Sequence, residues 1–339
     1  MKTVMLTCTL LLALSCFALA TPIPDTGQTA CYDNLQEIPC PAPGEPFYGQ
    51  DAQYPCNPQS YTKLDKHGND LPALAPWPWA MVRDNVTGLI WEMKTENGSI
   101  HHWEYWYKWY AAKHFFIPLL NLMRFGGFSD WRLPTVKELA GIVSPHHPQD
   151  YPPINTFYFK NTNDGAYWSS QSLTGSPRFA WYVDYSSGFP EIYDKRMTYI
   201  YIRAVRGTRS FNDFKDNGDG TVTDEATGLM WQQGTAPGLY NWEEALAYCE
   251  NLTFAGYDDW RLPKLKELQS IVDYTRYHPS IDPIFADTVS YAYWSSTTIP
   301  YPESASNVSF YYGSGTWYEK TARAYVRVVR GGQCEGGRS

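Results

Sequence analysis

The chain has 339 residues, of which 43% are hydrophobic and 18% charged, so it can bury a sizeable core and is long enough for two domains. Its formal net charge is −8 and it contains no run of lysine and arginine, which argues against nucleic acid as a partner. The 14 Trp, 27 Tyr and 15 Phe residues, with 25 Gly and 25 Pro, favour short strands and irregular loops over long helices.

The first twenty residues have the pattern of a secretory signal peptide. Lys2 provides a positive start, residues 6–19 are apolar but too few to span a bilayer, and small residues precede a predicted cleavage before Thr21. We therefore expect a secreted, periplasmic or cell-surface protein without a transmembrane segment. Lipid anchoring at Cys16 is disfavoured because the residues before it fit lipidation poorly.

Five cysteines follow the predicted cleavage, in a compartment that permits disulfides. Cys31 and Cys40 are close enough in sequence to close a small loop, and Cys249 with Cys334 is a second candidate pair. That pairing would leave Cys56 unpaired. The chain has no CxxC spacing, so neither a zinc site nor a thioredoxin-like redox centre is predicted.

Most of the remaining chain is a duplicated unit. The segment SDWRLPTVKEL at 129–139 returns as DDWRLPKLKEL at 258–268. A repeat unit of roughly 120 residues is too long for a solenoid, so we predict sister domains. Four further blocks recur in the same order: TGLxW at 87–91 and 227–231, a Trp-containing block at 102–104 and 241–243, YWSS at 167–170 and 293–296, and RxVRG at 203–207 and 327–331.

The predicted organisation follows from these blocks. It comprises a signal peptide at 1–20, a Pro-rich, Cys-containing leader at 21–63, a first domain at 64–208, a second domain at 210–332 and a Gly-rich tail at 333–339.

The run HHWEYWYKWY at 101–110 lies in an expansion of the first copy. If it is helical, its rings point to two sides, and one helix cannot bury both, so some rings should be exposed. Exposed rings can pack on the C–H faces of sugars, whereas the competing interpretation packs them against the second domain or the leader. The candidate ligand-binding residues are Trp103, Trp106, Tyr107, Trp109 and Tyr110; the adjacent His101 and His102 are expected at the surface rather than on a metal.

The WRLP and YWSS blocks are expected to hold the fold together. The arginine of each WRLP block can pair with the glutamate six residues later, Glu138 or Glu267. YWSS reads as a central strand rather than a serine nucleophile, because no His/Asp partner recurs with it. The residues with an expected structural role are Trp131, Arg132, Pro134, Trp168 and Arg206 in the first copy, and Trp260, Arg261, Pro263, Trp294 and Arg330 in the second.

The second copy gives the clearest local signals. Acidic residues from Asp216 to Asp224 resemble a calcium loop, but the terminal Glu of that pattern is absent, so a turn leading into a hairpin at 221–231 is predicted, with Gly228 at positive φ. No metal site is expected.

Two helices and a set of strands follow. A helix over 242–252 begins after Asn241 as N-cap, and a second has Pro263 in its first turn and Leu265, Leu268, Ile271 and Val272 as its apolar stripe. Alternating residues from 293 to 330 predict antiparallel strands, so the class is α+β.

The ordered blocks resemble the family of domain of unknown function 1566, also called the Lcl C-terminal domain, and both copies carry all five. The resemblance implies two tandem C-type-lectin-like domains, each with two helices flanking a small twisted antiparallel sheet, in a bacterial extracellular protein. Family members of understood role are adhesins that bind sulfated polysaccharides. Because such ligands need a cationic surface and this chain is acidic, either a local basic patch exists or the ligand differs.

The predicted function is a secreted, non-catalytic recognition protein that binds carbohydrate or another cell-surface ligand without a cofactor. The alternative is a structural or protein-docking component of the envelope. A third hypothesis, a formylglycine-generating-enzyme-like oxidase, is disfavoured because the C-terminal region offers only Cys334, outside the repeated unit.

Overall fold

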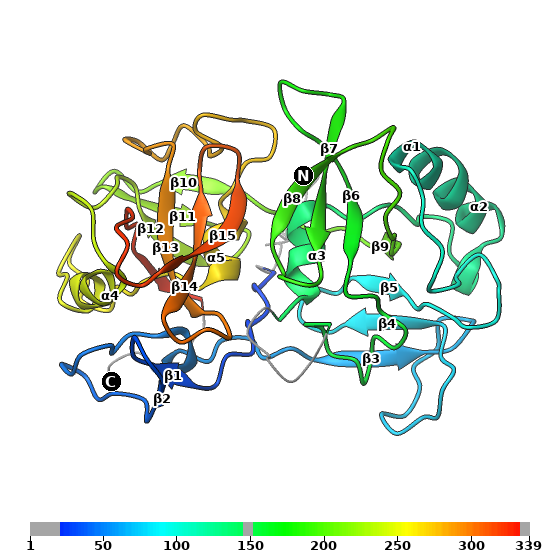
Figure 1. Cartoon of the computed structure of the whole chain (residues 1–339), viewed down its shortest axis with the longest axis horizontal. Coiled ribbons are helices and arrows are strands. Elements are labelled where there is room, and N and C mark those ends of the chain that lie inside the picture. The colour runs from blue at the N-terminus through cyan, green and yellow to red at the C-terminus, as the bar shows by residue number, and fades with distance from the viewer. Residues whose placement is uncertain (1–20, 145–151, 333–339) are drawn as a thin grey trace, which may run out of the picture.

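Two units of similar build lie side by side in the structure, a computed structural model that describes residues 21–144 and 152–332 (Figure 1). Each unit has one four-stranded and one three-stranded antiparallel sheet and a few short helices. The mixed class and the two tandem units agree with the sequence, but the strands of each unit form two sheets rather than one. Within the residues described, no helix is both long and apolar enough to cross a membrane.

The first unit, called domain 1 here, extends from β3 to β9. Its four-stranded sheet has the order β3 (Tyr61–Leu64), β4 (Met81–Asp84), β5 (Ile90–Glu92) and β9 (Val205–Arg206), and its three-stranded sheet contains β6 (Ala166–Ser172), β7 (Phe179–Asp184) and β8 (Pro190–Asp194). Its helices are α1 (Trp109–Ala111), the π-helix η2 (Ala112–Phe116), α2 (Ile117–Leu122), the 3-10 turn η3 (Phe125–Gly127) and α3 (Val136–Ile142).

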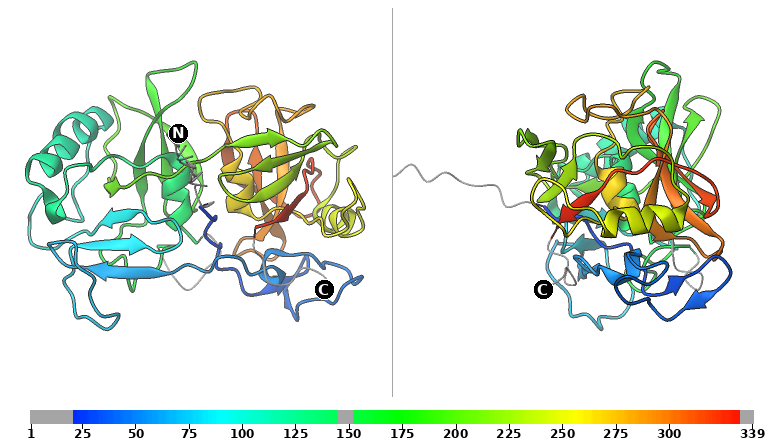
Figure 2. Two further views of the ribbon diagram at one scale, coloured as in Figure 1. Left: turned by 180° about the vertical axis from the view of Figure 1, so that it is seen from behind. Right: turned by 90° about the vertical axis from the view of Figure 1, so that its left-hand side faces the viewer.

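The second unit, domain 2, repeats this order from β10 to β16. Its four-stranded sheet has the order β10 (Phe214–Asp216), β11 (Thr221–Asp224), β12 (Leu229–Gln232) and β16 (Val329–Gly331). Its second sheet contains β13 (Ala292–Thr298), β14 (Ser304–Ser309) and β15 (Ser314–Glu319), and its helices are α4 (Trp242–Glu250) and α5 (Leu265–Ser270). Seen from behind, the four-stranded sheet of domain 1 lies low and that of domain 2 lies high, so the two units face opposite ways (Figure 2).

The same turn chemistry closes the first hairpin of both domains. The carboxylate of Asp84 accepts hydrogen bonds from the backbone after β4 and from the hydroxyl of Thr87 at 2.6 Å. Gly88 follows with φ +74°, a region that glycine enters without steric cost. Asp224 and Gly228 repeat this arrangement in domain 2, the glycine with φ +76°, which confirms the predicted hairpin.

The helix starts also follow local sequence signals. Asn241 caps α4 by accepting from the backbone N–H of Glu244 at 2.8 Å, as predicted. The second helix, α5, begins at Leu265 with Lys264 as N-cap, so Pro263 precedes the helix instead of lying in its first turn. All four residues of its predicted apolar stripe are buried.

Helices α3 and α5 pack against each other where the two domains meet, and one hydrophobic cluster contains residues of both. The lysines of the two KEL sequences exchange hydrogen bonds across this contact. Lys137 Nζ donates to the carbonyl of Ser270 at the end of α5, and Lys266 Nζ donates to the carbonyl of Gly141 near the end of α3, at 2.5 and 2.8 Å. The repeated lysine thus makes an equivalent hydrogen bond from each domain to the other. The shared hydrophobic cluster also joins the two domains.

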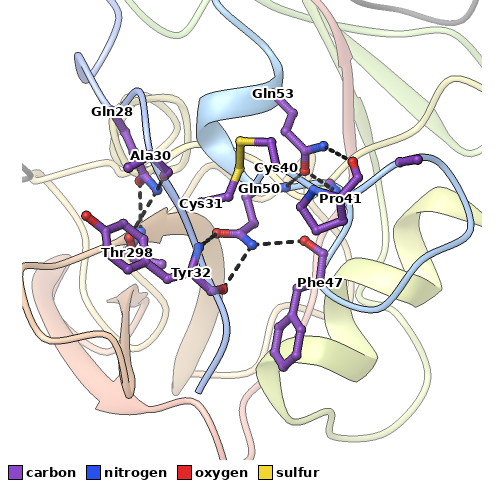
Figure 3. The surroundings of a disulfide bond; sticks show 12 residues. Gln28, Ala30, Cys31, Tyr32, Cys40, Pro41, Phe47, Gln50, Gln53 and Thr298 are labelled. Carbon is purple, nitrogen blue, oxygen red and sulfur yellow. Dashed lines mark hydrogen bonds between the residues drawn. A yellow bond between two sulfur atoms is a disulfide. The ribbon is translucent and has the colours of Figure 1, made fainter. Parts of the chain in front are cut away.

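The leader lies along domain 2, where it forms the hairpin β1 (Cys31–Tyr32) and β2 (Glu37–Ile38) and the 3-10 turn η1 (Asp51–Gln53) (Figure 1). The predicted Cys31–Cys40 disulfide is present, and Gln50 beside it holds the backbone of Tyr32 and Phe47 (Figure 3). This side-chain bonding gives the irregular leader a fixed conformation.

The other cysteine predictions were wrong. Cys249 is a free, buried thiol, because it lies on the inner face of α4 among apolar side chains. Cys56, expected to be unpaired, is disulfide-bonded. The predicted partner of Cys249, Cys334, lies outside the described residues, as do the signal peptide and Cys16.

Candidate functional site

The tryptophan that begins the first helix of domain 1 is Trp109, not Trp103. The indole N–H of Trp109 donates to the carbonyl of the first YWSS serine at 2.8 Å, and that of Trp242 makes the same bond in domain 2. A lysine ammonium, Lys195 or Lys320, lies 4.3 Å from the centre of each indole. The sequence match of His102 to Asn241 was therefore wrong, since the additional residues of domain 1 precede the helix as turns.

The aromatic run divides between core and surface. Trp109 is 4% exposed and belongs to the domain 1 core, and Tyr107 is half-buried against Phe116. Trp106 is 61% exposed and Tyr110 46% exposed, so these two present their rings to solvent. Trp103 is half-buried, and its backbone carbonyl accepts from Asn163.

The neighbouring His101 is buried, which corrects its expected surface position. Its ring contacts the buried carboxylate of Glu92 at 2.8 Å, beside the ammonium of Lys94. Burial opposes the ionisation of Glu92, but Lys94 and His101 outweigh it and lower its pKa to about 2. The sequence missed this pair because nothing in the run indicates which residue turns inward.

Each WRLP arginine forms the predicted bidentate ion pair. Arg132 donates to Glu138 at 2.8 and 2.7 Å, and Arg261 donates to Glu267 at 2.6 and 2.7 Å. The two pairs differ in accessibility, because the side chain of Arg132 is 34% exposed and that of Arg261 only 4%. The same motif is thus open in domain 1 and covered in domain 2.

The other repeated residues make matching contacts in both copies. The indole N–H groups donate to backbone carbonyls, from Trp131 to Phe125 and from Trp168 to Tyr107 in domain 1, and from Trp260 to Phe254 and from Trp294 to Tyr240 in domain 2. The carbonyls of Pro134 and Pro263 accept from the backbone N–H groups of Ser170 and Ser296. Arg206 and Arg330 form ion pairs with Asp130 and Asp259. These equal contacts align the two domains residue by residue.

A pocket of about 480 Å³ opens beside the WRLP block of domain 1. This domain 1 pocket contains three cationic side chains and one carboxylate, that of Glu138, which is already paired. Ser170, Thr135 and Thr208 add hydroxyl groups. The lining residues are Lys113, Ile117, Arg132, Leu133, Thr135, Glu138, Ser170, Thr208 and Arg209.

The leader fills the corresponding site of domain 2. Lys264 occupies the position of Thr135 and is buried against two leader carboxylates, Asp25 at 2.5 Å and Asp51 at 3.0 Å. Thr297, the residue after the YWSS block, donates its hydroxyl to Asp51 at 2.5 Å. The leader therefore brings two carboxylates to a site that remains open in domain 1.

Backbone groups of the leader are bound as well. Lys320, the counterpart of Lys195, donates to the carbonyls of Tyr32 and Asp33, whereas Lys195 donates to side-chain and backbone groups of its own domain. Gln28 exchanges two hydrogen bonds with Thr298, at 3.0 Å each. Domain 2 thus binds the acidic leader through both side chains and main chain.

The surroundings of the two sites shift the pKa values of their ionisable groups. Burial opposes ionisation of Asp25, but the ammonium of Lys264 outweighs it and lowers the pKa of Asp25. Burial also opposes protonation of Lys264, yet its carboxylate partners raise its pKa. In domain 1, burial lowers the pKa of Arg209 to about 10, so this guanidinium stays cationic at neutral pH.

Comparison with known protein families agrees with the paired architecture. A model of the Lcl C-terminal domain matches residues 80–206 and 220–330. The chain belongs to the Lcl C-terminal domain family. The two matches cover the helices and most strands of each Lcl C-terminal domain and exclude β3, β10 and the leader, while no curated protein matches the chain.

The sequence missed the residues that distinguish the two sites. Lys264 stands where the first copy has Thr135, a difference that is readable once the WRLP blocks are aligned. The role of Asp25 and Asp51 had no comparable signal, since they lie in an irregular leader. The acidic loop that starts at Asp216 forms the β10–β11 turn, and its carboxylates accept backbone hydrogen bonds there.

Proposed function

We propose that this chain is a secreted, non-catalytic recognition protein that holds an anionic group of an extracellular ligand in the domain 1 pocket. The single observation that supports this most is the contrast between the twin sites. The site of domain 2 is closed by carboxylates of the leader, whereas that of domain 1 is open and cationic. The pocket provides the local basic patch that an acidic chain needs for an anionic ligand.

Other features support an extracellular recognition role. The Cys31–Cys40 disulfide suits an oxidising compartment, and the proposed signal peptide suits export. Ser169 is buried and donates to the carbonyl of Trp181, a structural use of the YWSS serine. A C-type-lectin-like fold remains part of the proposal, since it would place such a site on a recognition scaffold.

An adhesin that binds polysaccharide is one form of this proposal. Trp106 and Tyr110 are exposed and could stack on sugar rings, and Tyr110 is three residues from the pocket residue Lys113 on the same helix. Docking of a protein segment is the second form, and the bound leader of domain 2 favours it.

The test compares two charge reversals in the same domain. Lys113→Glu places a carboxylate in the pocket, while Lys160→Glu makes the same change at another exposed site. The purified mature protein is measured by biolayer interferometry on heparin, polygalacturonate, neutral dextran and a poly-aspartate peptide. We expect binding to at least one anionic ligand, no binding to dextran, and selective loss with Lys113→Glu. Equal loss with both variants, or no binding to any anion, would refute a pocket-based function.

The exposed rings need a separate variant. Trp106→Ala with Tyr110→Ala removes surface rings without opening the core, unlike a change at Trp109. If the ligand is carbohydrate, this double variant should weaken polysaccharide binding and leave the thermal stability nearly unchanged.

A further inference from the structure

The domain 1 pocket and the leader-binding site of domain 2 are the same position in two copies of one fold. The backbone N–H of the first α3 residue donates to Gln171 at 2.9 Å, and that of the first α5 residue donates to Thr297 at 2.9 Å. The carbonyls of Pro134 and Pro263 accept from Ser170 and the matching serine at 2.7 and 2.8 Å. Because the two positions are equivalent, the leader bound to domain 2 indicates which kind of ligand the domain 1 pocket can bind.

We propose that the domain 1 pocket binds an acidic polypeptide segment of a partner protein, as domain 2 binds the leader of its own chain. The proposal rests on the function proposed above and names the ligand class of that site. In domain 2 the bound segment supplies carboxylates, main-chain carbonyls and a side-chain amide. Lys320 makes main-chain contacts in domain 2, and its counterpart Lys195 bonds within domain 1. At the domain 1 pocket the main-chain contact comes from Arg209, which lines the pocket and donates to the carbonyl of Pro22 in the leader at 2.8 Å. A peptide carbonyl is therefore a group that a residue of this pocket already binds.

The composition of the domain 1 pocket fits such a segment. Lys113, Arg132 and Arg209 line it and outnumber the single, paired carboxylate. Arg132 corresponds to Arg261 and is paired with Glu138. Lys113 and Arg209 therefore provide the charge that Lys264 gives domain 2, since domain 1 has Thr135 at that position. Among the residues described, those lining the pocket include no aromatic ring, so it has no stacking surface for a sugar. An acidic peptide satisfies both the charges and the hydroxyl donors.

The experiment uses fluorescence anisotropy with the full mature chain. The probes are a labelled aspartate decamer and a labelled peptide with the sequence of residues 46–55, PFYGQDAQYP, which contains Asp51 and Tyr54. The variants are Lys113→Glu in the pocket, Lys160→Glu as the control, and Thr135→Lys, which gives domain 1 the lysine found in domain 2. Labelled polygalacturonate and labelled heparin are the two further probes.

We expect saturable peptide binding that falls by about tenfold or more with Lys113→Glu and changes little with Lys160→Glu. Thr135→Lys should tighten binding by about tenfold, because it adds a cation beside the bound carboxylate. Domain 2 tolerates a lysine at this helix start, so the variant should fold. Circular dichroism and the melting temperature confirm that each variant is native before its binding is measured.

The outcomes separate this inference from the proposed function. Binding of polygalacturonate in a Lys113-dependent manner, with no binding of either peptide, would overturn the peptide proposal and leave the anion-binding function standing. No binding of peptide, polygalacturonate or heparin would overturn both. Weaker peptide binding by a natively folded Thr135→Lys protein would also overturn the proposed equivalence of the two sites.

Discussion

Removal of the Asp51 carboxylate should loosen the leader and destabilise the protein. Asp51 is fully buried and pairs with Lys264 at 3.0 Å, while it accepts hydroxyl bonds from Thr26 at 2.8 Å and Thr297 at 2.5 Å. Removing one member of a buried ion pair costs about 3–5 kcal/mol, because the other charge loses its partner. Lys264 keeps its bond to Asp25, so we expect the lower end, about 3 kcal/mol for Asp51→Ala.

The assay is urea unfolding followed by tryptophan fluorescence, with the melting temperature as a second readout. For a cooperative unit of about 150–250 residues, a loss of about 3 kcal/mol in unfolding free energy lowers the melting temperature by roughly 6–12 °C. Glu37→Gln, which removes an exposed leader carboxylate, is the matched control and should change the free energy of unfolding by less than about 0.5 kcal/mol. Equal effects of the two variants would refute the account of the buried ion pairs.

Three further predictions concern buried groups. Burial lowers the pKa of Lys266 to about 7, so between pH 7 and 8.5 this lysine carries more protons in the unfolded state and should add a rise in the free energy of unfolding of up to about 1.4 kcal/mol per pH unit. Burial lowers the pKa of Lys137 and Lys320 to about 7 as well, so in a urea series across this range Lys266→Met should reduce the slope by the share of one lysine, and exposed Lys66→Met should leave it unchanged. Arg261→Met should cost about 3–5 kcal/mol of unfolding free energy because it breaks a fully buried ion pair, and Arg132→Met about 1–3, because the side chain of Arg132 is 34% exposed and solvent screens its pair; equal costs would contradict this. Burial raises the pKa of the Cys249 thiol, so Ellman's reagent at pH 8 should modify it only after unfolding, and Cys249→Ser should remove that signal.

The duplication made much of the fold predictable from sequence. Asp–Thr–Gly turns, the Asn241 cap and the apolar stripe of α5 depend on residues close in the chain, so local patterns indicated them. The WRLP ion pairs were predictable for the same reason, since arginine and glutamate are six residues apart. The division of strands into two sheets was not, because it depends on pairing of β5 with β9 and β12 with β16.

The candidate site depends on contacts that no local pattern contains. Asp51 and Thr297 are 246 residues apart, and Asp25 and Lys264 are 239 apart, yet both pairs are in direct contact. In the aromatic run at 101–110, the sequence did not indicate which individual rings are buried. Its composition indicated exposed rings, but only the backbone path decides that Trp109 is buried and Trp106 exposed.

We propose that this protein has one open recognition site, in domain 1, and a twin in domain 2 closed by its own leader. Isothermal titration of the mature protein with the aspartate decamer tests it most directly, because the binding ratio counts the open sites. We expect one site per chain, lost in Lys113→Glu and retained in Lys160→Glu. Two equivalent sites per chain, or one site unaffected by Lys113→Glu, would contradict it.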